Sequence, residues 1–204
     1  FTEADLDIGQ NWRDNLYIRG KFLAEQEICR AVESGLCARI FRIGRLIGRR
    51  SDGVFQKNPD SNAFYRIVQG VRLLQALPES LAGLPLELSP VDLCAESIVA
   101  LEQADSTAFH VIQPDPAPLG RTLGVRFPNL EILSDDAFSQ RLSQASAEHA
   151  ETLASLIDLW NGLQHGAGNV TVSCEKTHCL LRQAGIAWPD QDMGHALDLF
   201  CLDG

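Results

Sequence analysis

The stretch "NLYIRGKFLAEQEICRAVESGLCARIFRIGRLIG", residues 15–48, gives the strongest indication of the fold. Its first part places apolar residues at helical spacing, and Gly35 stands where a glycine commonly follows a last helical turn. We therefore expect a helix over residues 15–34. The second part, residues 37–48, is rich in strand-forming residues and ends in glycines, which predicts a buried strand that runs into a loop. A helix followed by a buried strand is the repeating element of α/β proteins.

The same alternation continues to about residue 115 and favours a parallel sheet. After that point the sequence predicts mostly helix. The expected helices lie at 63–77, after Pro90, at 135–163, 175–185 and 192–202, and the expected short strands at 86–88, 107–114 and 169–173. Residues 123–133 fit either a strand or a loop.

Composition narrows the class of protein. The chain has 204 residues, 45% of them hydrophobic and 22% charged, which is typical of a globular domain. The formal net charge of −10 argues against nucleic acid as a partner, because phosphate binding needs a basic face. No apolar run is long enough to predict a membrane span, and the acidic start does not resemble a signal peptide. The chain opens on Phe1 in a polar stretch, so we expect a piece of a longer protein.

The cysteines indicate a compartment rather than a site. They stand at positions 29, 37, 94, 174, 179 and 201, with no CxxC pair. Most lie among apolar residues, as buried free thiols do, and a reducing cytoplasm fits best. The run "CEKTHC", residues 174–179, lacks a fourth ligand at zinc spacing, so a capped helix start is the better interpretation and no metal site is predicted.

Tyr17 and Lys21 form the first candidate for chemistry. Four residues apart on a helix, they share one face. A free tyrosine has a pKa of about 10, and a nearby ammonium group favours the phenolate. A tyrosine with such a neighbour can donate a proton to a developing alkoxide. The same spacing also occurs in ordinary amphipathic helices with a solvated lysine, and spacing alone does not decide between the two.

Four motifs follow one another along the chain, and the first of them contains the Tyr17–Lys21 pair. The first motif comprises Asn15, Tyr17, Lys21, Phe22, Ala24 and Glu25, and the second comprises Arg42, Gly44, Arg45 and Gly48. The third motif is residues 89–92 ("SPVD"), and the last comprises Thr177, Leu181, Gly185, Ile186, Trp188 and Pro189. Together they resemble an extended short-chain dehydrogenase/reductase. The sequence is most similar to the thioester reductase domains that terminate nonribosomal peptide synthetases, polyketide synthases and carboxylic acid reductases.

The resemblance implies an α/β fold, the C-terminal half of a Rossmann-like parallel sheet with a mostly helical C-terminal substrate lobe. We expect a single unit over residues 1–204, with the sheet part to about residue 115, the lobe from about residue 116, and the two intertwined. The intact protein would use NADPH to reduce a carrier-protein-bound acyl or peptidyl thioester, linked through phosphopantetheine, to an aldehyde or alcohol.

The resemblance also implies roles for particular residues. Tyr17 would protonate the substrate, and Lys21 would lower the pKa of that tyrosine and hydrogen-bond the nicotinamide ribose. The backbone around Ile43, Gly44 and Leu46 would lie against the nicotinamide. The family usually has serine where this chain has Gly20, and proline where it has Ile43.

The glycine-rich turn of a dinucleotide site is not found in these residues. The stretch "GLQHGAG", residues 162–168, follows a predicted helix instead of a strand. The third catalytic Ser or Thr of the family would lie upstream of Phe1. Two alternatives therefore stay open: a non-catalytic module that docks a carrier protein, and an extended reductase of the sugar-nucleotide epimerase or dehydratase type.

Structural roles are expected for the remaining polar candidates. Asp92 should bind backbone N–H groups at a helix start, and His110 should be a hydrogen-bonded core residue. A local basic run is expected to be a solvated face or a set of ion pairs, with contact to a cofactor phosphate or to a carrier protein's phosphopantetheine as the alternative. That run comprises Arg39, Arg42, Arg45, Arg49 and Arg50.

Overall fold

The computed structural model describes residues 1–9, 11–164 and 170–190. The helix expected at 192–202 and most of the "GLQHGAG" stretch lie outside these residues. In chain order the elements are α1 (Leu16–Glu33), β1 (Ile40–Ile43), β2 (Leu46–Ile47), the 3-10 helix η1 (Pro59–Ser61), α2 (Ala63–Leu74), β3 (Ala76–Pro78), α3 (Glu79–Ala82), β4 (Pro85–Leu86), β5 (Ser89–Pro90), α4 (Val91–Leu101), β6 (Ala108–Val111), β7 (Ala117–Pro118), α5 (Leu119–Arg126), β8 (Glu131–Leu133), α6 (Asp135–Gln164) and α7 (Glu175–Gln183).

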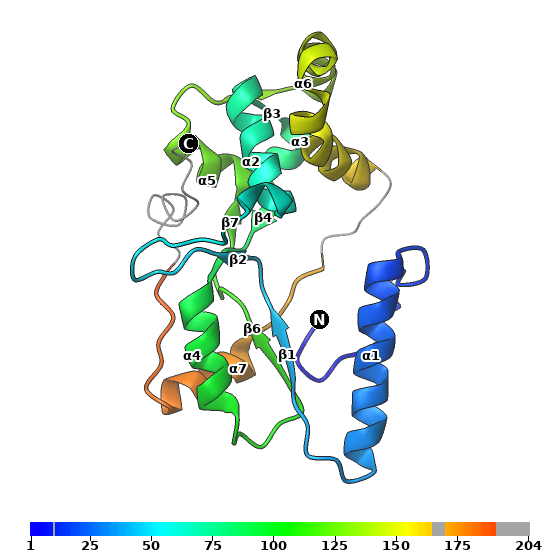
Figure 1. Ribbon diagram of the computed structural model, residues 1–204, viewed down its shortest axis with the longest axis vertical. Coiled ribbons are helices and arrows are strands. Elements are labelled where there is room, and N and C mark those ends of the chain that lie inside the picture. The colour runs from blue at the N-terminus through cyan, green and yellow to red at the C-terminus, as the bar shows by residue number, and fades with distance from the viewer. Residues whose placement is uncertain (10, 165–169, 191–204) are drawn as a thin grey trace.

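The part of the molecule that carries the candidate site is built on β1 and β6. These two strands pair in parallel over four residues, from Ile40 opposite Ala108 to Ile43 opposite Val111. In Figure 1, α4 and α7 lie beside β6, while α1 stands apart on the other side of β1. A small hydrophobic cluster joins α4, β6 and α7; its buried members are Cys94, Leu101, Phe109, Val111 and Leu181.

A larger hydrophobic cluster holds the other part together. It is formed by α2, α3, α5 and α6 around the short parallel pair β3–β8, with β4 and β7 pairing antiparallel below them (Figure 1). Its fully buried side chains include Val68, Leu77, Leu123, Phe138 and Leu156. Both clusters draw on segments from the two halves of the sequence. The domain division expected near residue 115 stays a prediction.

Most predicted elements are confirmed, and the α/β class with parallel strand pairs is correct. The predicted strand at 169–173 is wrong for the described residues, because 170–173 form no strand and bind residue 1 instead. Phe1 donates its terminal amine to the Thr171 carbonyl at 2.8 Å, and Ser173 donates its N–H to the Phe1 carbonyl at 2.8 Å. The segment 123–133 contains the end of α5 and then β8.

Two further observations concern the helices. The long helix α6 contains a non-helical residue, His149, so that it consists of two helical segments joined at a kink. Within the residues that the structure describes, no helix is long and apolar enough to cross a membrane.

Candidate functional site

Tyr17 and Lys21 lie together in the first turns of α1. The helix begins there because the Asn15 side chain accepts hydrogen bonds from the backbone N–H groups of Tyr17 and Ile18, at 3.0 and 3.1 Å. The Lys21 ammonium nitrogen lies 5.6 Å from the centroid of the Tyr17 ring. Tyr17 is 72% exposed and Lys21 is exposed as well. The pair is therefore formed, and it is open to a ligand.

The position of α1 places the start of this helix level with the carboxyl end of β1. In Figure 1, α1 runs in the direction opposite to β1, so that its first turn lies level with the carboxyl end of that strand. In open α/β sheets, ligands bind outside the carboxyl ends of the parallel strands.

Few contacts attach α1 to the rest of the protein. Phe22 is its only buried residue, and the Phe22 ring stacks on Trp12 with the centroids 4.6 Å apart. The second attachment is an ion pair between Glu25 of α1 and Arg42 of β1, with Nη2 and Oε2 2.8 Å apart.

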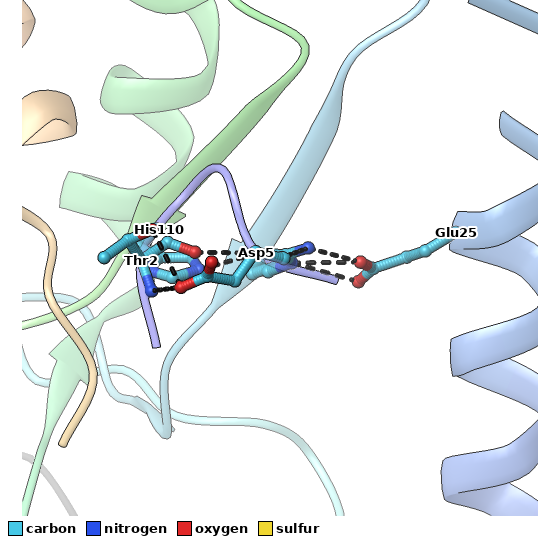
Figure 2. Close-up of polar contacts among 5 residues, drawn as sticks. Thr2, Asp5, Glu25 and His110 are labelled. Carbon is cyan, nitrogen blue, oxygen red and sulfur yellow. Dashed lines mark hydrogen bonds and ion pairs between the residues drawn. The ribbon is translucent and has the colours of Figure 1, made fainter. Parts of the chain in front are cut away.

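Arg42 makes contacts in several directions. Figure 2 shows polar contacts that link Glu25 on α1, His110 on β6 and the N-terminal segment at Thr2 and Asp5. The Arg42 guanidinium donates to the Asp5 carbonyl at 2.7 Å and lies 2.9 Å from Nε2 of His110. Its carbon lies 4.6 Å from the centroid of the Phe1 ring.

His110 is a hydrogen-bonded core histidine, as its sequence context predicts. It is 1% exposed, with Nδ1 2.6 Å from the Ser173 carbonyl and Nε2 facing Arg42. The two contacts fit a neutral ring that donates from Nδ1 and accepts at Nε2. Burial lowers the pKa of His110, and the Arg42 charge lowers it further, although the Ser173 carbonyl opposes both effects.

At the carboxyl ends of β1 and β6, Glu87 binds the backbone that follows each strand. Its carboxylate accepts from the N–H of Arg45 at 2.6 Å and from the N–H of Gln113 at 3.0 Å. The Ser89 hydroxyl donates to the same carboxylate. A Cβ at Gly44 would lie 2.6 Å from the carboxyl carbon of Glu87. The carboxylate thus accounts for the absence of a side chain at Gly44.

A cavity of about 530 Å³ opens beside this contact. Ile43, Gly44 and Glu87 line it, together with apolar residues of the segments 112–116 and 170–172. Tyr17, Lys21 and Leu46 are not among its described lining residues. Leu46 is 40% exposed and pairs with Ser89 across β2 and β5. Of the predicted residues, Tyr17 and Lys21 therefore lie together on α1, whereas Ile43 and Gly44 line the cavity.

The basic run is largely used in structural contacts, which confirms the ion-pair interpretation for two of its members. Arg42 pairs with Glu25, and Arg49 with Asp52 at 2.7 Å. Arg39 donates to the Ala104 carbonyl at 3.1 and 3.2 Å.

Asp92 binds a backbone N–H group at a helix start, as predicted, and it also binds the loop that follows β2. Its carboxylate accepts from the N–H of Leu93 at 3.1 Å, at the start of α4. It also accepts from the N–H groups of Arg50 and Ser51, at 2.9 and 3.1 Å. Burial raises the pKa of Asp92, but the three backbone N–H groups outweigh burial and lower it overall.

The start of α7, in the "CEKTHC" run, is capped from the other end of the chain. The N-cap residue Cys174 makes no side-chain cap, whereas the Glu3 carboxylate binds the N–H of Thr177 at 3.0 Å. His178 lies with Nε2 2.8 Å from the Ile112 carbonyl. Among the cysteines, Cys94 and Cys174 are buried as expected, but Cys37 and Cys179 are exposed. Burial is the main reason that the pKa of Cys94 rises to about 12.

The last sequence motif is a packing motif. Gly185 ends α7 with a φ of 81°, and the chain turns back so that Ile186 and Trp188 pack against the cluster around Phe109. The Trp188 indole N–H donates to the Ser97 hydroxyl of α4 at 3.0 Å.

Glu3, Glu25 and Glu87 are the polar residues to which the sequence assigned no role. Each binds a partner at least 17 positions away in the chain. Glu25 belongs to the first motif, which marked its position in the sequence, and Glu87 stands two residues before the third motif.

Comparison with known proteins agrees with this geometry. Residues 1–98 match an NAD-binding family described as "Male sterility protein". Over 200 residues the chain is 27% identical to one of the subunits of linear gramicidin synthase from Brevibacillus parabrevis, a match that covers 92% of this chain and 4% of that protein.

Two solved structures superpose on nearly the whole chain. A thiolation–reductase di-domain from an archaeal non-ribosomal peptide synthetase matches 98% of it, with a TM-score of 0.82 and 28% identity. The reductase domain of the aureusimine biosynthetic cluster matches 98%, with a TM-score of 0.83 and 26% identity. The chain spans 42% and 53% of those two chains.

These likenesses support a nicotinamide cofactor. The resemblance to thioester reductase domains expected from the sequence is confirmed: over nearly its whole length the chain is similar to the reductase domains of an archaeal non-ribosomal peptide synthetase and of the aureusimine biosynthetic cluster.

Proposed function

We propose that the full-length protein that carries this chain is an NADPH-dependent reductase. Its substrate would be an acyl or peptidyl thioester held on the phosphopantetheine of a carrier protein, and its product an aldehyde or an alcohol. The observation that carries the proposal is the exposed Tyr17 ring with the Lys21 ammonium 5.6 Å from its centroid, at the ligand-binding end of a parallel strand pair.

Each member of the pair has a role in this reaction. The cofactor, when bound, supplies the hydride that adds to the thioester carbonyl carbon. The Tyr17 hydroxyl would donate a proton to the carbonyl oxygen as negative charge develops there, and the positive charge of Lys21 would stabilise the phenolate that is left. The thiohemiacetal formed in this way would then break its C–S bond and release the aldehyde and the phosphopantetheine thiol of the carrier. An alcohol product would need a second round of hydride and proton transfer. The side chains of Tyr17 and Lys21 are open to the solvent, as the binding of a ribose and a substrate carbonyl between them requires.

The residues present fit the nicotinamide end of the cofactor only. Tyr17 and Lys21 supply a phenol and an ammonium group, which can hydrogen-bond ribose hydroxyls. The phosphate end needs a glycine-rich turn at a helix N-terminus, and the part of the chain that the structure describes offers no candidate for it. The likeness to a thiolation–reductase di-domain of a peptide synthetase supports a carrier protein as partner. NADPH in place of NADH is part of the proposal and rests on the family resemblance of the sequence.

The test is the Tyr17→Phe variant of the full-length protein, assayed with NADPH and a carrier-bound thioester. Loss of a positioned general acid should lower turnover by a factor on the order of 10² to 10⁴. The dissociation constant for NADPH, followed by nicotinamide fluorescence, should stay within about twofold of wild type. Tyr65→Phe, at the second of the two tyrosines, is the matched control and should keep normal turnover.

Near-normal turnover in Tyr17→Phe would contradict the assignment of the proton donor. Failure of the full-length protein to bind NADPH at all would contradict the reductase proposal and favour a module that docks carrier proteins without chemistry.

A further inference from the structure

The face of α1 that carries Tyr17 and Lys21 continues to Glu25, four residues further on. Successive side chains at this spacing lie roughly above one another, so Glu25 stands about 12 Å along the helix axis from Tyr17. Glu25 is therefore the next group of the proposed site, one turn beyond Lys21.

Glu25 has two cations within reach of its carboxylate. On its own helix Lys21 lies four residues before it, which is the spacing at which oppositely charged side chains pair. From β1, Arg42 approaches with Nε and Nη2, which lie 3.0 and 2.8 Å from Oε2. In the structure Arg42 holds the carboxylate, and the Lys21 ammonium lies over the Tyr17 ring instead.

Arg42 is itself fixed, so this choice of partner is built into the fold. Its side chain is 15% exposed. Nη2 donates to the Asp5 carbonyl at 2.7 Å, and Nη1 lies 2.9 Å from Nε2 of His110 (Figure 2). Because His110 is neutral and accepts at Nε2, it can take this hydrogen bond without repelling the guanidinium.

We propose that Arg42 is a positioning residue for the Tyr17–Lys21 pair. It holds α1 against β1 through Glu25, and by occupying that carboxylate it leaves the Lys21 ammonium beside Tyr17. Without Arg42, the half-buried carboxylate of Glu25 takes Lys21 as its counter-ion, and the ammonium moves one turn away from the phenol. Only the catalytic consequence rests on the proposed function; the contact itself does not.

The contact is tested by NMR on the 204-residue chain without cofactor. The readout is the nuclear Overhauser effect between the Lys21 ε-methylene and the Tyr17 ring, with the ring-current shift of that methylene as a second measure. Arg42→Met should abolish both signals. The double variant Arg42→Met/Glu25→Gln should restore them, because a neutral amide no longer attracts Lys21. Glu25→Gln alone should leave them in place.

The double variant separates positioning from a merely structural role. If Arg42 only stabilised the fold, removing the Glu25 charge as well would not bring Lys21 back to Tyr17. Signals that persist in Arg42→Met, or that stay lost in the double variant, would refute the proposal, and so would their absence from the wild-type chain. Arg42→Gln replaces Arg42→Met if the latter does not fold, because its amide can still donate to the Asp5 carbonyl.

The second test measures kcat and its pH dependence in the full-length protein. Arg42→Met should lower kcat by a factor of about 10 to 100, a part of what a positioned general acid contributes, and should shift the pH–rate profile to higher pH. Glu25→Gln in the same protein should reverse much of both changes. Arg49→Met, which breaks only the surface pair with Asp52, is the control.

The two tests fail independently. The expected NMR result without any thioester reduction would refute the proposed function and leave the positioning role of Arg42 standing. Reduction that needs Tyr17 but is unaffected by Arg42→Met would refute the positioning role alone.

Discussion

The Glu3 carboxylate accepts hydrogen bonds from both the backbone N–H and the hydroxyl of Thr177, at 3.0 and 2.9 Å. Thr177 stands in the first turn of α7, and Glu3 is 7% exposed. The first residues of the chain therefore cap one of its last described helices, and they fix the N-terminal segment that also contacts Arg42 through Asp5 and Thr2.

The first prediction is that Glu3→Gln destabilises the chain at neutral pH by about 1–2 kcal/mol, because the two hydrogen bonds from Thr177 to one charged carboxylate oxygen become weaker bonds to a neutral amide oxygen. Chemical denaturation at pH 7 measures this difference in the free energy of unfolding. Glu96→Gln, at an exposed position of α4, is the matched control and should change stability by less than about 0.5 kcal/mol.

The contribution of Glu3 should also depend on pH. Burial raises the pKa of Glu3, but the N–H and hydroxyl groups of Thr177 outweigh burial and lower it below the ordinary value of 4.5. A depressed pKa means that the stabilisation is fully present above about pH 4.5 and is lost as pH falls through the folded-state pKa. The gap between wild type and Glu3→Gln should therefore narrow below pH 4.5, and a constant gap would contradict the prediction.

The second prediction concerns the strand ends beside the cavity. Gly44→Ala places a methyl group against the Glu87 carboxylate, which three donors hold in position. Overpacking of this kind costs about 1–3 kcal/mol. Thermal unfolding should show this loss of stability as a lower melting temperature. When Glu87 is already replaced by alanine, adding Gly44→Ala should cost less stability than it does in the wild type, so that the effects of the two changes are not additive.

Gly124→Ala serves as the control for this experiment. Gly124 lies in α5, and a Cβ there would meet nothing within 4 Å. Because alanine is the better helix former, this variant should be stabilised by up to about 1 kcal/mol. Equal effects at both glycines would rule out the clash with Glu87.

The third prediction is that Gly20→Ala stabilises α1, because a Cβ at Gly20 also meets nothing within 4 Å. Replacing a glycine within a helix favours folding by up to about 1 kcal/mol. Since α1 has only Phe22 buried, the gain should appear mainly as slower hydrogen exchange of α1 amides. Unchanged protection of α1 would mean that the glycine does not limit the stability of this helix.

Local patterns in the sequence located the helices well and the side-chain contacts poorly. The helix predicted for residues 15–34 runs from Leu16 to Glu33, because apolar spacing, the Asn15 cap and the glycine at 35 all act within a few residues. The strand predicted at 169–173 fails because an apolar alternation needs a neighbouring strand, whereas the backbone groups of residues 171 and 173 bind Phe1 and the His110 side chain.

The parts of the site that depend on contacts between distant residues could not be predicted. Nothing near Glu25 in the sequence shows that Arg42 will bind it, and nothing near Gly44 shows that Glu87 will occupy its side-chain space. By contrast, Tyr17 and Lys21 were found because a helix brings them together in a single turn.

The fourth prediction is that Asp92→Asn releases the loop between β2 and η1. Both carboxylate oxygens of Asp92 accept backbone N–H groups, from Arg50 and Leu93 at one oxygen and from Ser51 at the other. An asparagine amide can keep one of these acceptor positions but presents a donor at the other, which leaves at least one loop N–H without its partner. The free energy of unfolding should fall by about 1–2 kcal/mol.

The local effect of Asp92→Asn on the loop should be larger than its effect on global stability, because trypsin cleavage after Arg49 and Arg50 needs only the loop to open. Limited proteolysis under native conditions should therefore be clearly faster in Asp92→Asn than in wild type, while Asp105→Asn, at an exposed position after α4, should be cut at the wild-type rate. Equal cleavage rates in all three proteins would show that Asp92 does not restrain the loop.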